Sequence, residues 1–204
     1  TFDLCCKVPL ALFTRYVTPT EIRRAVNLAA PDWVFLDASP GEAARMAAQA
    51  SGAKIFRSEP EESDPTPSPG ETLPEPNTDS QRPFTLLFTS GTSGRAKAIV
   101  HSAANYWEST MAGVRRLGSS DHDIWLAATP LHHVGGLAIL VRCAILGTTV
   151  RLQKGFDPAR VAESLLSGTV TQASVVPAMI DPLLEALEGR RRLLSDIERG
   201  VVDR

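Results

Sequence analysis

Cysteine is scarce in this sequence. Only three occur among the 204 residues: Cys5 and Cys6 are adjacent, and Cys143 stands alone. They fit no metal-ligand spacing and leave an odd count. We therefore expect reduced thiols in a cytoplasmic protein, and no metal site built from protein ligands.

Strong charge and long apolar runs are also missing. The net charge of −2 argues against a nucleic-acid or anionic-membrane partner. The longest apolar run, Val134–Leu146, is interrupted by Arg142 and is shorter than the ~18 residues that a membrane span needs. No basic-then-apolar signal segment follows Thr1. The 43% hydrophobic content predicts a soluble globular protein with a substantial core. The oligomeric state stays open.

The usual nucleotide-binding fingerprints are absent around the most distinctive stretch, which lies between the apolar runs Phe84–Phe88 and Ala98–Val100. Gly91 and Gly94 are too close together for a P-loop, and no G-x-G-x-x-G is present. The hydrolase elbow G-x-S-x-G does not fit either.

What is present there is a loop of small hydroxylic residues and glycine between two predicted strands. Its glycines let a ligand approach the backbone, and consecutive N–H groups in such a loop can bind an anion. A lysine supplies a point charge suited to phosphate. This composition suits a polyphosphate, although an ordinary flexible turn remains the alternative. The residues are Thr89, Ser90, Gly91, Thr92, Ser93, Gly94 and Lys97.

The run from Thr89 to Ala98 resembles the phosphate-binding loop of the adenylate-forming enzymes, the superfamily of acyl-CoA synthetases, luciferases and peptide-synthetase adenylation domains. That loop reads T-S-G-[ST]-[ST]-G-x-P-K-G, and here Ala96 replaces the proline and Ala98 the glycine. The resemblance implies that the seven residues above bind ATP, with Lys97 also acting in catalysis.

A second cluster, Thr129–Leu137, follows a predicted strand (Asp123–Ala128) and opens a predicted helix (Gly135–Leu146). Ligands bind outside the carboxyl ends of strands in open α/β sheets, and a helix N-terminus favours an anion. A pair of structural histidines is the alternative. The segment resembles the family's P-[LM]-[FY]-H-x-x-G motif. This implies substrate binding by His132, His133 and Gly135, with His133 also catalytic and His132 in place of the aromatic.

Alternating strands and helices predict an α/β fold with a mostly parallel, doubly wound sheet and helices on both faces. We expect an α/β portion over 1–56 that includes a capping box at Thr18 and Glu21. An exposed, Pro-rich acidic loop or linker follows over 57–83. A second α/β portion over 84–204 carries both clusters. The resemblance implies part of the large N-terminal domain of an adenylate-forming enzyme.

The wider run from Ile124 to Val150 is most similar to the o-succinylbenzoate–CoA ligases of menaquinone biosynthesis. This implies an AMP-forming acid–thiol ligase that uses ATP, Mg²⁺, coenzyme A and a small carboxylic acid. The family's adenine, ribose, hinge and C-terminal lysine motifs are absent, so we expect an internal fragment that is inactive alone. Another acyl-CoA synthetase, an acyl-AMP ligase that loads a carrier protein, and a truncated non-catalytic nucleotide-binding module remain alternatives.

Overall fold

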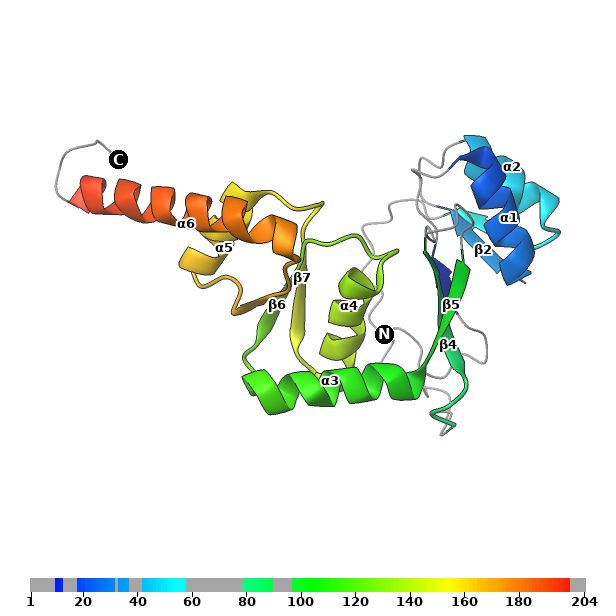
Figure 1. Ribbon diagram of the computed structural model, residues 1–204, viewed down its shortest axis with the longest axis horizontal. Helices are drawn as coiled ribbons and strands as arrows, with labels where there is room; N and C mark the ends of the chain where they lie inside the picture. The colour runs from blue at the N-terminus through cyan, green and yellow to red at the C-terminus, as the bar shows by residue number, and fades with distance from the viewer. Residues whose placement is uncertain are drawn as a thin grey trace, which may run out of the picture. The chain divides into compact units, whose positions relative to one another are not determined.

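The computed structural model describes residues 10–12, 18–31, 33–36, 42–57, 79–89 and 97–198, which fall into two compact units divided between Asn105 and Tyr106 (Figure 1). Each unit has its own strands and helices. Cys5 and Cys6 lie outside the described residues.

The first unit opens with the capping box that the sequence predicts. The Thr18 hydroxyl caps α1 (Pro19–Ala29) by accepting a hydrogen bond from the Glu21 backbone N–H at 3.3 Å. The Glu21 carboxylate accepts hydrogen bonds from the Thr18 hydroxyl and backbone N–H, and both lower the pKa of Glu21. Ile22 and Val26 of α1 pack against Ala47 of α2 (Glu42–Ala50).

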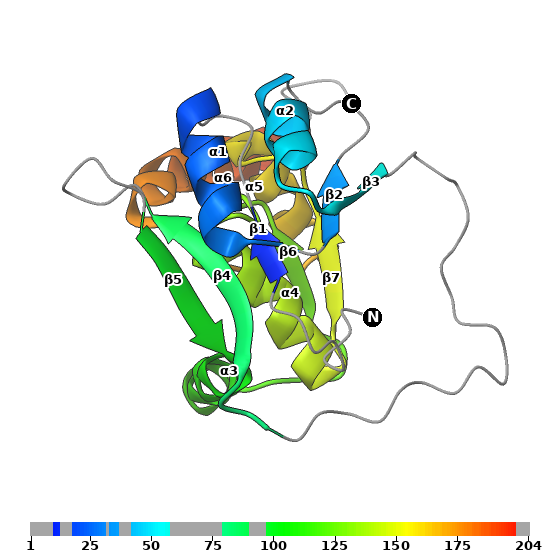
Figure 2. The same cartoon turned by 90° about the vertical axis from the view of Figure 1, so that its right-hand side faces the viewer.

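The strands of the first unit form two small sheets. β2 (Trp33–Leu36) pairs in parallel with β3 (Lys54–Arg57). β4 (Pro83–Thr89) pairs in parallel with β1 (Leu10–Leu12) and antiparallel with β5 (Lys97–Ser102). Figure 2 shows β4 and β5 side by side. The strand–loop–strand prediction is thereby confirmed at its two strands, while residues 90–96 lie outside the described ones.

The second unit is built on a parallel sheet with the strand order β7-β6-β8. Helix α3 (Ala103–Leu117) leads into it from the first unit. The remaining elements are β6 (Ile124–Ala127), α4 (Val134–Leu146), β7 (Thr149–Leu152), α5 (Pro158–Leu166), β8 (Gln172–Ala173) and α6 (Pro177–Glu198).

The central strand β6 supplies side chains to two cores, because successive residues of a strand point to opposite faces. Trp125 and Ala127 pack on α4, whereas Leu126 and the following Ala128 pack on α5 and α6. Figure 1 shows α4 on one face of β6 and β7, and α5 and α6 on the other. The buried partners are Ile139, Leu140 and Cys143 on the first face, and Val161, Ala162 and Leu183 on the second.

These arrangements confirm the predicted α/β fold, with helices on both faces of the β7-β6-β8 sheet. Of the five strand pairings in the described residues, four are parallel. Within the described residues the strands form three sheets rather than one, and the β4–β5 pair is antiparallel. A connection of seven residues is too short for the crossover that a parallel pair needs.

Strand β8 has only two residues, Gln172 and Ala173, and within the described residues it pairs with β6 alone. The boundaries of the expected linker also differ. Strands β3 and β4 each enter the expected 57–83 linker by one residue, at Arg57 and Pro83. Residues 58–78 lie outside the described ones.

No helix in the described ranges has the length and apolar character needed to cross a bilayer.

Candidate functional site

The ends of the predicted phosphate loop are brought together by the β4–β5 hairpin. Thr89, the last residue of β4, lies opposite Lys97, the first residue of β5, and both are exposed. The structure therefore places one predicted hydroxyl and the predicted cation at the mouth of the seven-residue connection 90–96. Ser90, Gly91, Thr92, Ser93 and Gly94 lie outside the described residues, and their binding role stays a prediction.

The second predicted cluster forms a tight turn into α4. The His133 backbone N–H donates to the Pro130 carbonyl at 3.1 Å, and His133 is the N-cap residue of α4. Its carbonyl accepts hydrogen bonds from the N–H groups of Gly136 and Leu137. The His133 side chain makes no capping hydrogen bond. The imidazole is therefore held at the start of the helix without being used to cap it.

The two histidine rings lie against each other, with centroids 4.3 Å apart and planes tilted by 50°. His133 is exposed and His132 is half-buried. Burial, and then the proximity of His133, lower the pKa of His132. Because both effects disfavour a positive charge on His132, this ring is held neutral at pH values where a free imidazole would begin to protonate.

A cavity of about 310 Å³ lies at the carboxyl ends of β6 and β8. β6 is followed by α4 on one face of the sheet, whereas β8 is followed by α6 on the other. Neighbouring strands whose connections leave to opposite faces create the crevice in which open α/β sheets bind ligands. The lining residues are Ser109, Thr129, Val134, Gly135, Ala138, Ile139, Arg142, Ser174, Val175 and Val176.

Arg142 is the one charged residue among the described residues that line this cavity. Its guanidinium carbon lies 4.6 Å from the centre of the Trp125 ring, within the range of a cation–π contact. Within the described residues, Arg142 Nε and the Thr129 hydroxyl are buried without hydrogen-bond partners. A ligand that supplies hydrogen-bond acceptors would satisfy both groups, so the cavity suits a ligand with an anionic group.

The structure separates the residues of the second predicted cluster. Gly135 lines the cavity, whereas His132 and His133 lie in the turn beside it and are not among the lining residues. Substrate binding by all three stays a prediction. Thr129 and Arg142 were missed as functional residues. The available signal for Arg142 was its position as the lone charge in an otherwise apolar helix, since a helix that is apolar all round is buried and tolerates a charge only at a cost.

A sequence profile of the AMP-binding enzymes matches residues 8–201. The chain belongs to this AMP-binding enzyme family. The match covers nearly the whole sequence, so it confirms the family resemblance that the loop at Thr89–Ala98 indicates.

The AMP-binding relatives include 2-succinylbenzoate–CoA ligases. The protein of Listeria monocytogenes serotype 4b (strain F2365) is 38% identical over 111 residues, which cover 54% of this chain and 24% of the relative. That of Geobacillus kaustophilus (strain HTA426) is 39% identical over 109 residues, which cover 53% and 22%. The match thus spans about a quarter of the length of these curated relatives.

Solved structures of AMP-binding enzymes share the fold. The o-succinylbenzoate CoA synthetase (MenE) of Bacillus subtilis, in complex with the acyl-adenylate intermediate OSB-AMP, aligns with a TM-score of 0.73 and 24% identity, covering 89% of this chain and 46% of that one. The same enzyme in complex with ATP and magnesium ion gives a TM-score of 0.71 and 25% identity, covering 87% and 36%. A putative long-chain-fatty-acid CoA ligase of Rhodopseudomonas palustris gives 0.75 at 18% identity, covering 89% and 47%.

Proposed function

We propose that the complete protein carrying this chain is an AMP-forming acid–thiol ligase that joins 2-succinylbenzoate to coenzyme A, as a cytoplasmic step of menaquinone biosynthesis. One observation carries the proposal: among the described residues that line the cavity at the carboxyl ends of β6 and β8, Arg142 alone is charged. The names of the curated relatives support the choice of acid.

The proposed reaction has two steps. A substrate carboxylate oxygen attacks the α-phosphorus of ATP, and the bond from that phosphorus to the bridging oxygen breaks, giving the acyl-adenylate and pyrophosphate. The thiol of coenzyme A, losing its proton, then attacks the acyl carbon, and AMP leaves. Positioning and charge stabilisation dominate catalysis of such transfers.

Residues at the mouth of the β4–β5 hairpin fit the phosphate end of this reaction. Lys97 supplies a positive charge and Thr89 a hydroxyl on adjacent strands, and both are exposed to a ligand. Magnesium would accompany ATP and neutralise phosphate charge. In the described part of the chain no group of three or more His, Cys, Asp or Glu side chains could hold a metal by itself.

Residues of the cavity fit the acid. 2-Succinylbenzoate carries two carboxylates, of which one reacts and the other remains charged. A guanidinium pairs strongly with a carboxylate, so Arg142 would bind the carboxylate that does not react. Thr129 would add a hydroxyl, and Gly135 leaves the start of α4 open because no atom lies within 4 Å of the position of a Cβ there. His133 stands beside this opening at the N-cap.

Pyrophosphate release by the purified complete protein tests the proposal. ATP and magnesium are supplied with 2-succinylbenzoate or with a panel of other carboxylates, and the acyl acceptor is then either coenzyme A or an acyl-carrier protein. We expect 2-succinylbenzoate to give the highest kcat/KM, with coenzyme A as the acceptor. Release with another acid alone would reassign the substrate, and transfer only to the carrier would indicate a carrier-loading ligase. No release with any acid would overturn the proposal.

A further inference from the structure

The contact between Trp125 and Arg142 connects the core of the second unit to its cavity. Trp125 is 6% exposed and lies in the cluster that joins β6 to α4, whereas Arg142 comes from the far half of α4 and lines the cavity. The side chain that contacts the guanidinium is therefore itself held by packing in the core of the second unit.

Packing alone does not account for tryptophan at position 125. Its indole Nε1 is buried and has no hydrogen-bond partner in the described residues. A buried donor without a partner is unfavourable, and a purely apolar side chain at this site would avoid that penalty. What the indole offers in return is the best aromatic face for a cation, and the Arg142 guanidinium carbon lies 4.6 Å from its centre.

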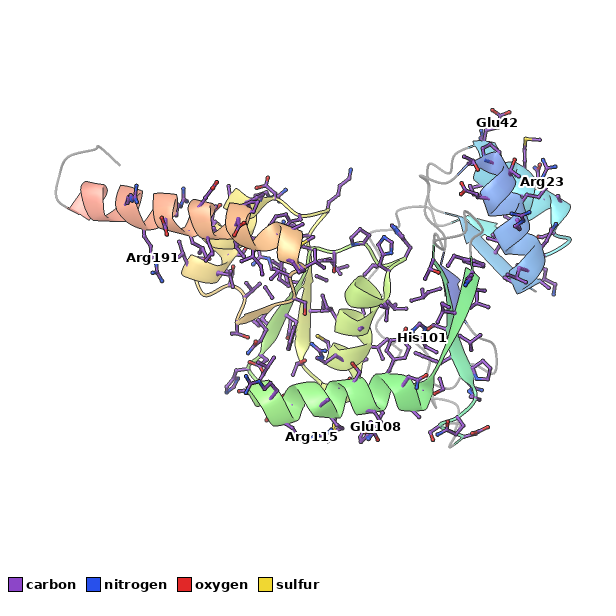
Figure 3. All side chains as sticks on the ribbon, viewed as in Figure 1. Arg23, Glu42, His101, Glu108, Arg115 and Arg191 are labelled. Carbon is purple, nitrogen blue, oxygen red and sulfur yellow. The ribbon has the colours of Figure 1, made fainter. Side chains whose placement is uncertain are left out.

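Helix α3 approaches the same guanidinium. Figure 3 shows Glu108 and Arg115 on the outer side of α3. Tyr106, Thr110 and Gly113 follow the spacing of the opposite side, and the first two are buried. A Cβ atom on Gly113 would lie 3.7 Å from both Cζ and Nη2 of Arg142. A methyl group fits there without displacing Arg142, but a branched side chain would occupy the place of the guanidinium.

We propose that Trp125 is a positioning residue, whose ring holds Arg142 where it meets the second, non-reacting carboxylate of the acid. The absence of a side chain at Gly113 keeps that position open. This inference rests on the proposed function and adds to it the means by which the enzyme distinguishes dicarboxylic from monocarboxylic acids.

The test compares substrates that differ only in the second carboxylate. 2-Succinylbenzoate is assayed beside 4-oxo-4-phenylbutanoate and 2-butanoylbenzoate, each of which lacks one of its two carboxylates, and the analogue that is still adenylated serves as the monocarboxylic reference. The variants, made in the complete protein, are Trp125→Leu, which removes the aromatic face, and Trp125→Phe, which keeps a smaller one. KM and kcat are measured for pyrophosphate release.

We expect Trp125→Leu to raise the KM for 2-succinylbenzoate by about 2- to 30-fold, the range of a cation–π contact. The KM for the reference analogue should stay within about twofold, since that analogue does not use Arg142. Trp125→Phe should raise the KM for 2-succinylbenzoate by a smaller factor than Trp125→Leu does. If Trp125 had a purely structural role, Trp125→Leu would change the KM for both substrates by the same factor. That result would overturn the inference.

Gly113 provides a second test if Trp125→Leu fails to fold. Gly113→Val is expected to raise the KM for the dicarboxylate selectively, whereas its matched control Gly113→Ala leaves the guanidinium in place and the KM ratio unchanged. Equal KM ratios in both variants would overturn the inference. If the unmodified protein adenylates neither 2-succinylbenzoate nor its analogues, the proposed function itself fails. If the unmodified protein is active but no variant changes the KM for the dicarboxylate selectively, only the role of Trp125 is overturned.

Discussion

Gly136 and Pro130 touch backbone to backbone at the start of α4. A Cβ atom on Gly136 would overlap the Pro130 carbonyl oxygen and lie 2.7 Å from that of Thr129. Glycine at 136 therefore lets the helix pack closely on the segment that leaves β6, next to Thr129 and Gly135, which line the cavity.

Replacing Gly136 with alanine should destabilise the fold. The new methyl group must push the helix away from the loop, and overpacking of this kind costs about 1–3 kcal/mol. Urea unfolding followed by circular dichroism measures the free energy. Gly135→Ala is the matched control, because nothing lies within 4 Å of its Cβ position. Equal unfolding free energies for the two variants would contradict the close contact.

Thr18→Ala should lower stability by about 1 kcal/mol, because it removes an N-cap hydroxyl. Thr20→Ala, in the first turn of the same helix, is the control and should have a smaller effect.

The capping hydrogen bonds place the pKa of Glu21 in the folded protein below its ordinary value of 4.5. Their contribution is therefore present above pH 4.5 and is lost as the pH falls through the folded pKa. A Glu21→Gln variant should lose less stability than the unmodified chain over that range.

Protonation of His132 should destabilise the folded protein. Its folded pKa lies below the ordinary value of 6.5, so the unfolded chain binds the proton more readily. Stability thus falls as the pH drops below 6.5. We expect the unmodified chain to lose more unfolding free energy between pH 7.5 and pH 5 than His132→Phe does. Substitution of the exposed His122 serves as the control, and parallel pH profiles for the unmodified chain and His132→Phe would refute the assignment.

In the complete protein, Lys97→Ala should raise the KM for ATP by about 10- to 100-fold without abolishing turnover. This corresponds to one charge-assisted hydrogen bond of roughly 1.5–3 kcal/mol, with the neighbouring donors still in place. The measurement is pyrophosphate release at varied ATP concentration. The exposed Lys154, which follows β7, gives a control of equal charge. An unchanged KM for ATP would exclude a phosphate-binding role for Lys97.

Local signals in the sequence predict local structure well. The Thr18–Glu21 capping box marks the start of α1, and the helix expected over Gly135–Leu146 is α4, which begins one residue earlier and ends at the same residue. These features depend on residues a few positions apart, whose hydrogen bonds and side-chain spacing are set by the helix itself.

Long-range relationships were beyond the same reasoning. The order β7-β6-β8 brings Ser174–Val176 next to Thr129, and no pattern of residue spacing in the sequence predicts that these residues are close. Arg142 was visible as a lone charge, but its contact with Trp125 depends on how α4 packs on β6. The cavity could therefore be located near the end of one strand from the sequence, while its composition required the pairing of strands.

Strand β6 is hydrogen-bonded to a neighbour along both edges and shares its side chains between two cores. Neither layer of helices can detach without exposing one face of β6 to water. The amide protons of β6 should therefore be among the last in the second unit to exchange with deuterated solvent. Deleting a single residue within it would turn every subsequent side chain toward the wrong layer. Natural variation in length is therefore expected in the surrounding loops and not in this strand.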